Sequence, residues 1–196
     1  FKTDTSWDQA QGFVERLGKT ADQLGLGFGV KFSNTLIVEN HRSFFPESEK
    51  EMYLSGPPLH VLASNLVDCF RQRFGDGYPI SFSAGIDRKN FADAVAIGLT
   101  PITSCSDLLK TGGYSRASTY FRELDARMDR LGVNNIPDYI IKVYGHSEES
   151  LSQCGLAESD PRLKACRQAL ENGESLREAS GPELHATWLS RSKLIN

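Results

Sequence analysis

The stretch YPISFSAGIDRKNFADAVAIGLTPITSCS, residues 78–106, contains two short β-like runs with a helical segment between them. Ser-Ala-Gly follows the first run, Ile80 to Phe82, and Ser-Cys-Ser follows the second, Pro101 to Thr103. Strands that alternate with helices indicate βαβ units with parallel strands. In a parallel sheet the C-terminal ends of the strands face the ligand side. The two small-residue turns are therefore the first candidates for a binding site.

The flanking segments continue this alternation. Helices are predicted over residues 7–24 with Ser6 as N-cap, from Pro57 or Pro58 to Gly75, over residues 88–99, and from about 114 to 131. Strands are predicted over residues 28–38, 79–86 and 101–105, and the proline-containing segment 41–58 is expected to be a long irregular loop. The pattern predicts the α/β class with a parallel sheet.

The chain divides by composition near residue 145. Residues 1–145 carry all the predicted strands, whereas residues 146–196 are polar, rich in Ser and Glu, and contain two short amphipathic stretches. With 196 residues the chain is long enough for one main core. We expect one α/β domain over 1–145 and a helical appendage or linker over 146–196.

Charge and hydropathy narrow the class of protein. The formal net charge is −3 and the Lys and Arg residues are scattered, which argues against a nucleic-acid partner. No run approaches the roughly 18 apolar residues of a membrane span. The first residues, Phe-Lys-Thr-Asp-Thr, lack a starting Met and a signal-peptide pattern. We expect a cytoplasmic protein without a membrane span, and a chain that is a segment of a longer polypeptide.

The four cysteines, Cys69, Cys105, Cys154 and Cys166, form no C-x-x-C pair. This spacing argues against a zinc ribbon or an iron–sulfur ligand set within the chain, so no metal site is predicted. Cys69 lies beside Leu66 and Phe70 at helical spacing and is expected to be a buried thiol.

The two turns can be interpreted in two ways. Ser83, Ala84 and Gly85, and then Cys105 and Ser106, offer unobstructed backbone N–H donors at neighbouring strand ends, as in barrels that bind a phosphate there. Gly and Ser also occur in strand-to-helix turns for steric reasons alone, and this alternative has equal weight.

Several other residues have both a functional and a structural interpretation. Lys110, Gly112, Gly113 and Arg116 form either an anion site or an ordinary glycine loop. His60 is expected to be structural, although it follows Ser55 and Gly56 closely, and Lys31 is either a cofactor ligand or an ion-paired lysine. Asp87 and Asp107 are expected to be helix N-caps.

Four stretches carry a resemblance to a known family: GFGVKFSNTL, YLSGPPLH, ISFSAGIDRKNFADAVAIGL and ITSCSDLLKTGGY. They resemble the C-terminal half of the FMN-binding (β/α)8 TIM barrel of the dihydroorotate and dihydropyrimidine dehydrogenase superfamily. The variant in the selenate reductase iron–sulfur subunit family, which is related to glutamate synthase, is more similar still. The resemblance covers about residues 28–131 and implies a partial barrel with parallel strands.

The resemblance also implies roles for individual residues. Lys31 falls on a strand lysine that lies beside the flavin N1 and C2 carbonyl and stabilises the anionic reduced flavin, and Asn34 falls near a substrate or flavin amide contact. The remaining implied cofactor-binding residues belong to turns that contact the flavin phosphate or ribityl region: Ser55, Gly56, Ser83, Ala84, Gly85, Cys105 and Ser106. No catalytic acid or base is assigned.

Two functions follow from the resemblance. In the first, the chain is the phosphate-binding half of an FMN-type barrel in a multidomain iron–sulfur flavoprotein oxidoreductase, inactive alone, with clusters on parts of the parent protein outside this chain. In the second, it is a degenerate barrel without flavin that serves as a docking module, as Ala84 at a family glycine position suggests. The expected partners are other domains of the parent polypeptide, with a homodimer if the open sheet edge is self-paired.

Overall fold

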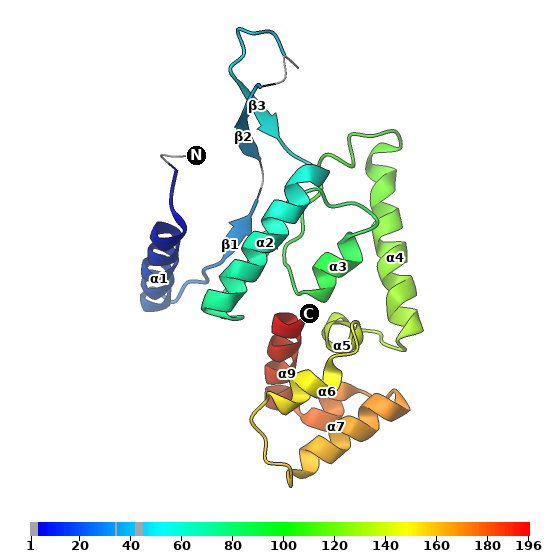
Figure 1. Ribbon diagram of the computed structural model, residues 1–196. Helices are drawn as coiled ribbons and strands as arrows, with labels where there is room; N and C mark the ends of the chain where they lie inside the picture. The colour runs from blue at the N-terminus through cyan, green and yellow to red at the C-terminus, as the bar shows by residue number, and fades with distance from the viewer. Residues whose placement is uncertain (1–3, 34, 42–44) are drawn as a thin grey trace.

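The computed structural model describes residues 4–33, 35–41 and 45–196 (Figure 1). The first part mixes helices and short strands: α1 (Trp7–Gln23), β1 (Val30–Phe32), β2 (Leu36–Glu39), β3 (Glu51–Leu54), α2 (Pro57–Phe74), β4 (Ile80–Phe82), α3 (Phe91–Ala96), the 3-10 helix η1 (Gly113–Arg116) and α4 (Ala117–Arg130). The remainder is helical: α5 (Ile136–Lys142), α6 (Ser147–Ser152), α7 (Pro161–Asn172), α8 (Leu176–Ser180) and α9 (Pro182–Ile195).

Three parallel segments form the predicted sheet. β1 pairs in parallel with β4, with Phe32 opposite Phe82, and Phe82 forms a parallel bridge to Ile102. The segment around Ile102 is held by the N–H of Phe82, which donates to the carbonyl of Pro101 at 3.0 Å. The prediction of parallel strands separated by helices is confirmed, since α2 and α3 occupy the two connections. Within the described residues the strands do not close into a barrel.

The chain differs from prediction between residues 28 and 58. The expected single strand is two strands, and β2 turns away to pair antiparallel with β3, with Leu36 opposite Leu54. The prediction of an irregular loop over 41–58 is therefore wrong for residues 51–54. In β3 Met52 and Leu54 are half-buried while Glu51 and Tyr53 are exposed, the period-two pattern of a strand with one covered face. The hairpin projects away from the rest of the molecule (Figure 1).

The helix ends follow local sequence signals. Ser6 caps α1, since its Oγ accepts from the N–H of Gln9 while its own N–H donates to Gln9 Oε1. α2 begins at the two prolines and ends at Phe74, with Gly75 as its C-cap at a φ of +61° that suits glycine. α3 is shorter than predicted because it begins only at Phe91. The N-cap prediction for Asp87 is wrong: its Oδ1 accepts from the N–H of Lys89 in a turn before the helix.

The main core lies between α2 and the parallel strands. α2 contributes a stripe of buried residues at helical spacing, and β4 contributes Ile80 and Phe82. Val30 and Phe32 pack against this core, whereas Lys31 is exposed. Because side chains alternate along a strand, Lys31 lies on the sheet face away from α2, in register with Ser81. The stripe on α2 consists of Leu59, Ala63, Val67 and Phe70.

The C-terminal helices pack around Trp188. This side chain is fully buried, and its indole N–H donates to the carbonyl of Ser147 and to Ser150 Oγ, each at 3.0 Å. Ile141 of α5 belongs to the same core although it precedes residue 146. The end of α9 contacts the α/β part, since Asn196 Nδ2 donates to the carbonyl of Ala96 at 3.2 Å. Figure 1 shows the end of the chain beside α3. The division near residue 145 stays a prediction.

The structure also bears on the predictions about membrane spans and about Cys69. None of the described helices, including the 18-residue α2, has the length and apolar character that crossing a membrane requires. The prediction of a buried Cys69 thiol is wrong, because Cys69 is exposed. The residue lies beside the buried stripe of α2, one position before Phe70, and its direction on the helix points it to solvent.

We expect the Trp188→Ala variant to lose about 3–5 kcal/mol of unfolding free energy, because it leaves a cavity and unpartnered groups in the helical core. The matched control is Trp7→Ala, whose side chain is 36% exposed and should cost about 1 kcal/mol or less. Urea denaturation measures both. Equal losses for the two variants would contradict this description of the core.

Candidate binding site at the strand ends

A cavity of about 270 Å³ lies where the parallel strands end. It is lined by residues from turns that follow β1, β3, β4 and the bridge at Ile102: Thr35, Ser55, Gly56, Ser83, Gly85, Ile86, Thr103, Cys105, Ser106 and Leu109. Six of the residues proposed from the sequence meet here: Ser55, Gly56, Ser83, Gly85, Cys105 and Ser106. Turns far apart in sequence therefore share one small, polar space.

The other three proposed residues lie elsewhere. Ala84 is buried in the main core and is not among the residues lining the cavity. Lys31 is exposed on the sheet face away from α2 and does not line the cavity either. Asn34 lies outside the described residues. Since the Ala84 side chain is buried in the core, it does not narrow the cavity.

Two glycines allow the turns to approach each other. Gly85 has φ +59°, and a Cβ placed on it would lie 2.6 Å from the carbonyl oxygen of Gly56 and 2.7 Å from Cα of Pro57. Gly56 has φ +70°, and its Cβ would lie 3.4 Å from Ser106 Oγ. Both backbone conformations favour glycine, and at Gly85 the close contact with backbone atoms excludes a side chain as well. The cavity therefore depends on glycine at these two positions.

Backbone N–H groups at the cavity are available to a ligand. The N–H groups of Gly56, Gly85, Cys105 and Ser106 donate to no other residue that the structure describes. Gly56 is buried and immediately precedes α2, where the helix dipole is positive. Buried N–H groups are almost always hydrogen-bonded in folded proteins. An anionic oxygen at this place would satisfy the buried Gly56 donor and accept from the half-buried Gly85 and Ser106, whereas Cys105 is exposed to solvent.

Hydrogen bonds behind the cavity fix the turn after β4. His60 Nδ1 lies 2.8 Å from the carbonyl oxygen of Ala84, and Asn90 Nδ2 donates to the carbonyl of Gly85 at 2.9 Å. The N–H of Asp87 donates to Asn90 Oδ1 at 2.8 Å. His60 is not among the residues lining the cavity, and its contacts favour the structural interpretation.

Asp107 holds together the segment that follows the cavity. Its buried carboxylate accepts from Arg116 at 2.8 and 3.0 Å, from Lys110 Nζ at 3.0 Å and from the Tyr120 hydroxyl at 2.7 Å. The Arg116 hydrogen bonds outweigh burial and hold the pKa of Asp107 well below its usual range. Asp107 is thus the centre of an ion-pair cluster, and its N-cap prediction is wrong.

The ion-pair cluster around Asp107 also bears on whether the loop 110–116 is an anion site or a structural loop. Both cations of the predicted anion site, Lys110 and Arg116, pair with Asp107. Tyr120 connects the cluster to the cavity wall, because its hydroxyl lies 3.2 Å from Ser104 Oγ, which donates to the carbonyl of Ile86. The contacts favour a structural role for this loop.

Some lining residues were missed by sequence reasoning. Thr35 and Thr103 line the cavity, and each lies close after a strand, which is the signal that could have identified them. Ile86 and Leu109 supply apolar wall and carry no such signal. Within the described part of the chain, no cluster of three or more His, Cys, Asp or Glu side chains could hold a metal ion.

Comparison with known proteins gives one family. Residues 1–150 match the family model described as "Oxidoreductase YgfK, N-terminal TIM-barrel domain". The chain is similar to "Putative oxidoreductase YgfK" of Escherichia coli strain K12 and of E. coli O157:H7, each 38% identical over 136 residues. These residues are 69% of this chain but 13% of either relative. No solved structure gives a significant match.

We expect Gly85→Ala to lower the unfolding free energy by about 2 kcal/mol or more, because strained backbone and a close contact with the Gly56 carbonyl add together. Gly155→Ala is the matched control: its φ is +74°, but no atom lies within 4 Å of the added Cβ, so only about 1 kcal/mol of backbone strain is expected. Thermal and urea unfolding compare the two. A Gly85 variant no less stable than the control would contradict the close approach.

We expect Asp107→Asn to destabilise the fold by about 3 kcal/mol at neutral pH, since it leaves Arg116 without its buried partner. The low pKa of Asp107 in the folded state means that its stabilising contribution is complete above the ordinary Asp pKa of about 4 and is lost as pH falls below it.

The stability gap between wild type and Asp107→Asn should therefore shrink as pH is lowered from about 5 toward 2. Asp125→Asn, at an exposed position on α4, is the control and should show a small gap at every pH. A gap for the Asp107 variant that does not change with pH would refute this ion-pair assignment.

Proposed function

The chain belongs to the family of YgfK N-terminal TIM-barrel oxidoreductase domains, and from this premise we propose that its strand-end cavity binds the phosphate end of FMN. The whole protein would then be an iron–sulfur flavoprotein oxidoreductase. The observation that carries the proposal is that Gly56, Gly85 and Ser106 meet around one cavity and that their N–H groups donate to no described residue. A phosphate dianion suits such donors at the start of a helix.

The size of the cavity limits which part of the cofactor it could hold. Sites for whole cofactors and drug-sized ligands are usually about 300–1,000 Å³. At about 270 Å³ this cavity has room for a phosphate and the adjoining polyol, and its serine and threonine lining suits both. The ring system would extend past the cavity and contact other parts of the protein.

We propose that Lys31 serves the ring end of the same cofactor. Lys31 is the middle residue of β1, and it lies on the sheet face away from α2. A closed barrel would enclose that face. A bound flavin supplies hydride and electron transfer. The Lys31 ammonium would stabilise negative charge at the pyrimidine end of that ring, and we keep Asn34 as a proposed amide contact there.

The remaining parts of the activity belong to the rest of the protein. The chain spans 13% of the length of the relatives that it matches. We propose that those other parts carry the remaining barrel strands and the iron–sulfur clusters, and that the edges of the β1–β4 sheet pair with those strands, or with a second copy when the chain is isolated.

A second function, a docking module without flavin, is favoured by a different observation. Large apolar side chains are exposed on α1 and just after it: Trp7, Phe13, Leu17, Leu24 and Leu26. Exposed apolar patches mark protein interaction surfaces. In this alternative the strand-end turns are retained for packing alone.

We expect Ser106→Asp, made in the complete protein and purified without oxygen, to lower FMN affinity at least about tenfold, because the new carboxylate would repel the phosphate. Ser118→Asp, at an exposed position of α4, should leave affinity unchanged. Flavin released on denaturation and FMN titration of the apoprotein measure this.

The same experiment separates the two functions. If the wild-type protein releases no flavin on denaturation and takes up none on titration, the FMN proposal is wrong and the docking module is favoured. If Ser106→Asp and Ser118→Asp bind FMN as tightly as wild type, flavin binds but its phosphate does not lie in this cavity.

A further inference from the structure

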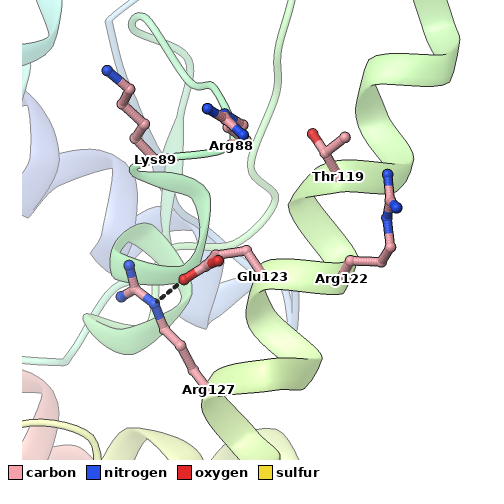
Figure 2. A pocket seen from close by; sticks show the side chains of 6 residues that line it. All are labelled: Arg88, Lys89, Thr119, Arg122, Glu123 and Arg127. Carbon is pink, nitrogen blue, oxygen red and sulfur yellow. Dashed lines mark hydrogen bonds and ion pairs between the residues drawn. The ribbon is translucent and has the colours of Figure 1, made fainter.

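A second cavity, of about 530 Å³, lies between the loop that follows β4 and the helix α4 (Figure 2). Arg88 and Lys89 come from the loop, and the other lining residues come from one stretch of α4: Thr119, Arg122, Glu123 and Arg127. We call these six residues the basic cleft. Every side chain that lines it is polar or charged, and four of the six are cationic.

The one carboxylate in the basic cleft is already paired. Glu123 Oε1 accepts from Arg127 Nε at 3.1 Å, drawn as a dashed line in Figure 2. Arg127 also pairs through Nη1 with Asp93, and this hydrogen bond is the main reason that its pKa is raised. Arg127 is therefore charged and balanced by two acids. Neither acid is left to neutralise the other cations of the cleft.

Three cations in the basic cleft have no ion-pair partner among the described residues. Arg88, Lys89 and Arg122 make no ion pair with any residue that the structure describes. Four arginines outside the cleft do have an acid partner: Arg73, Arg116, Arg162 and Arg167. An uncompensated positive cluster is unusual in a chain of net charge −3.

The chemistry of the lining selects the kind of ligand. No aromatic or aliphatic side chain lines the basic cleft, so it has no surface for an apolar or stacked group. The Thr119 hydroxyl donates to the carbonyl of Arg116, so the donors available are the three cationic heads. Guanidinium groups bind phosphate oxygens through paired hydrogen bonds, and lysine adds a point charge.

We propose that the basic cleft binds a diphosphate group, held between Arg88 and Lys89 on the loop and Arg122 on α4. Two linked phosphates carry several negative charges and enough oxygens to engage all three side chains at once. The volume exceeds what a diphosphate needs, so the group belongs either to free pyrophosphate or to an ester whose remainder extends into solvent.

This site does not rest on the flavin proposal. The strand-end cavity offers neutral backbone N–H groups from Gly56, Gly85 and Ser106, whereas the basic cleft offers charged side chains. The two lists of lining residues share no member. The same loop contributes Gly85 and Ile86 to the first and Arg88 and Lys89 to the second, so the sites are neighbours along the chain.

The test is titration of the 196-residue chain with sodium pyrophosphate at low salt, followed by calorimetry or amide chemical shifts. We expect saturable binding with a dissociation constant of about 1 mM or lower. Arg122→Gln and Arg88→Gln should each weaken binding about tenfold, the effect of one charge-assisted hydrogen bond. Arg130→Gln is the matched control on the same helix, outside the cleft, and should bind like wild type.

A Ser106 variant tests where the anion binds, and a titration with ADP tests whether it is a free anion or an ester. Ser106→Asp should leave pyrophosphate binding unchanged, since a loss would place the anion in the strand-end cavity and overturn the proposal. Binding of ADP as tight as that of pyrophosphate would indicate an ester as the source, and weaker ADP binding would indicate the free anion. The proposal would also be overturned if neither pyrophosphate nor ADP bound saturably, or if Arg130→Gln weakened pyrophosphate binding as much as Arg122→Gln does.

Discussion

The strand-end cavity depends on the approach of the Gly85 turn to the backbone of Gly56 and Pro57. A Cβ on Gly85 would lie 2.6 Å from the Gly56 carbonyl oxygen, so the first turn of α2 and the end of β4 meet without side chains between them. This contact sets the start of α2, and through α2 it sets the main core against Ile80 and Phe82. The strand-end cavity is a consequence of the same approach.

The support for the turns comes from polar groups that do not line the cavity. His60 and Asn90 hold the carbonyls of Ala84 and Gly85, and Tyr120 joins Ser104 to the buried Asp107 cluster. These bonds fix the backbone, while the N–H groups of Gly85 and Ser106 donate to none of the residues that the structure describes. A fold that holds its donors in place before binding loses less conformational entropy when an anion binds.

The sequence predicted the parts that depend on local signals. Small residues after Ile80–Phe82 and Pro101–Thr103 identified four residues of the cavity, and the family resemblance added Ser55 and Gly56. Proline and glycine marked both ends of α2. Pairing between distant residues was not predictable. β3 forms because it pairs with β2. Asp107 is not an N-cap because its carboxylate accepts hydrogen bonds from Arg116 and Tyr120, which come later in the chain. Cys69 was misplaced because one position on a helix rotates a side chain by about 100°.

The central claim is that the strand-end turns hold a phosphate of FMN, and amide chemical shifts test it most directly. The measurement compares FMN with riboflavin, which lacks the phosphate, as each is added to the isotope-labelled chain. The account predicts that FMN shifts the amides of Gly56, Gly85 and Ser106 and that riboflavin leaves them in place. Amides that do not move with FMN, or that move equally with riboflavin, would contradict it.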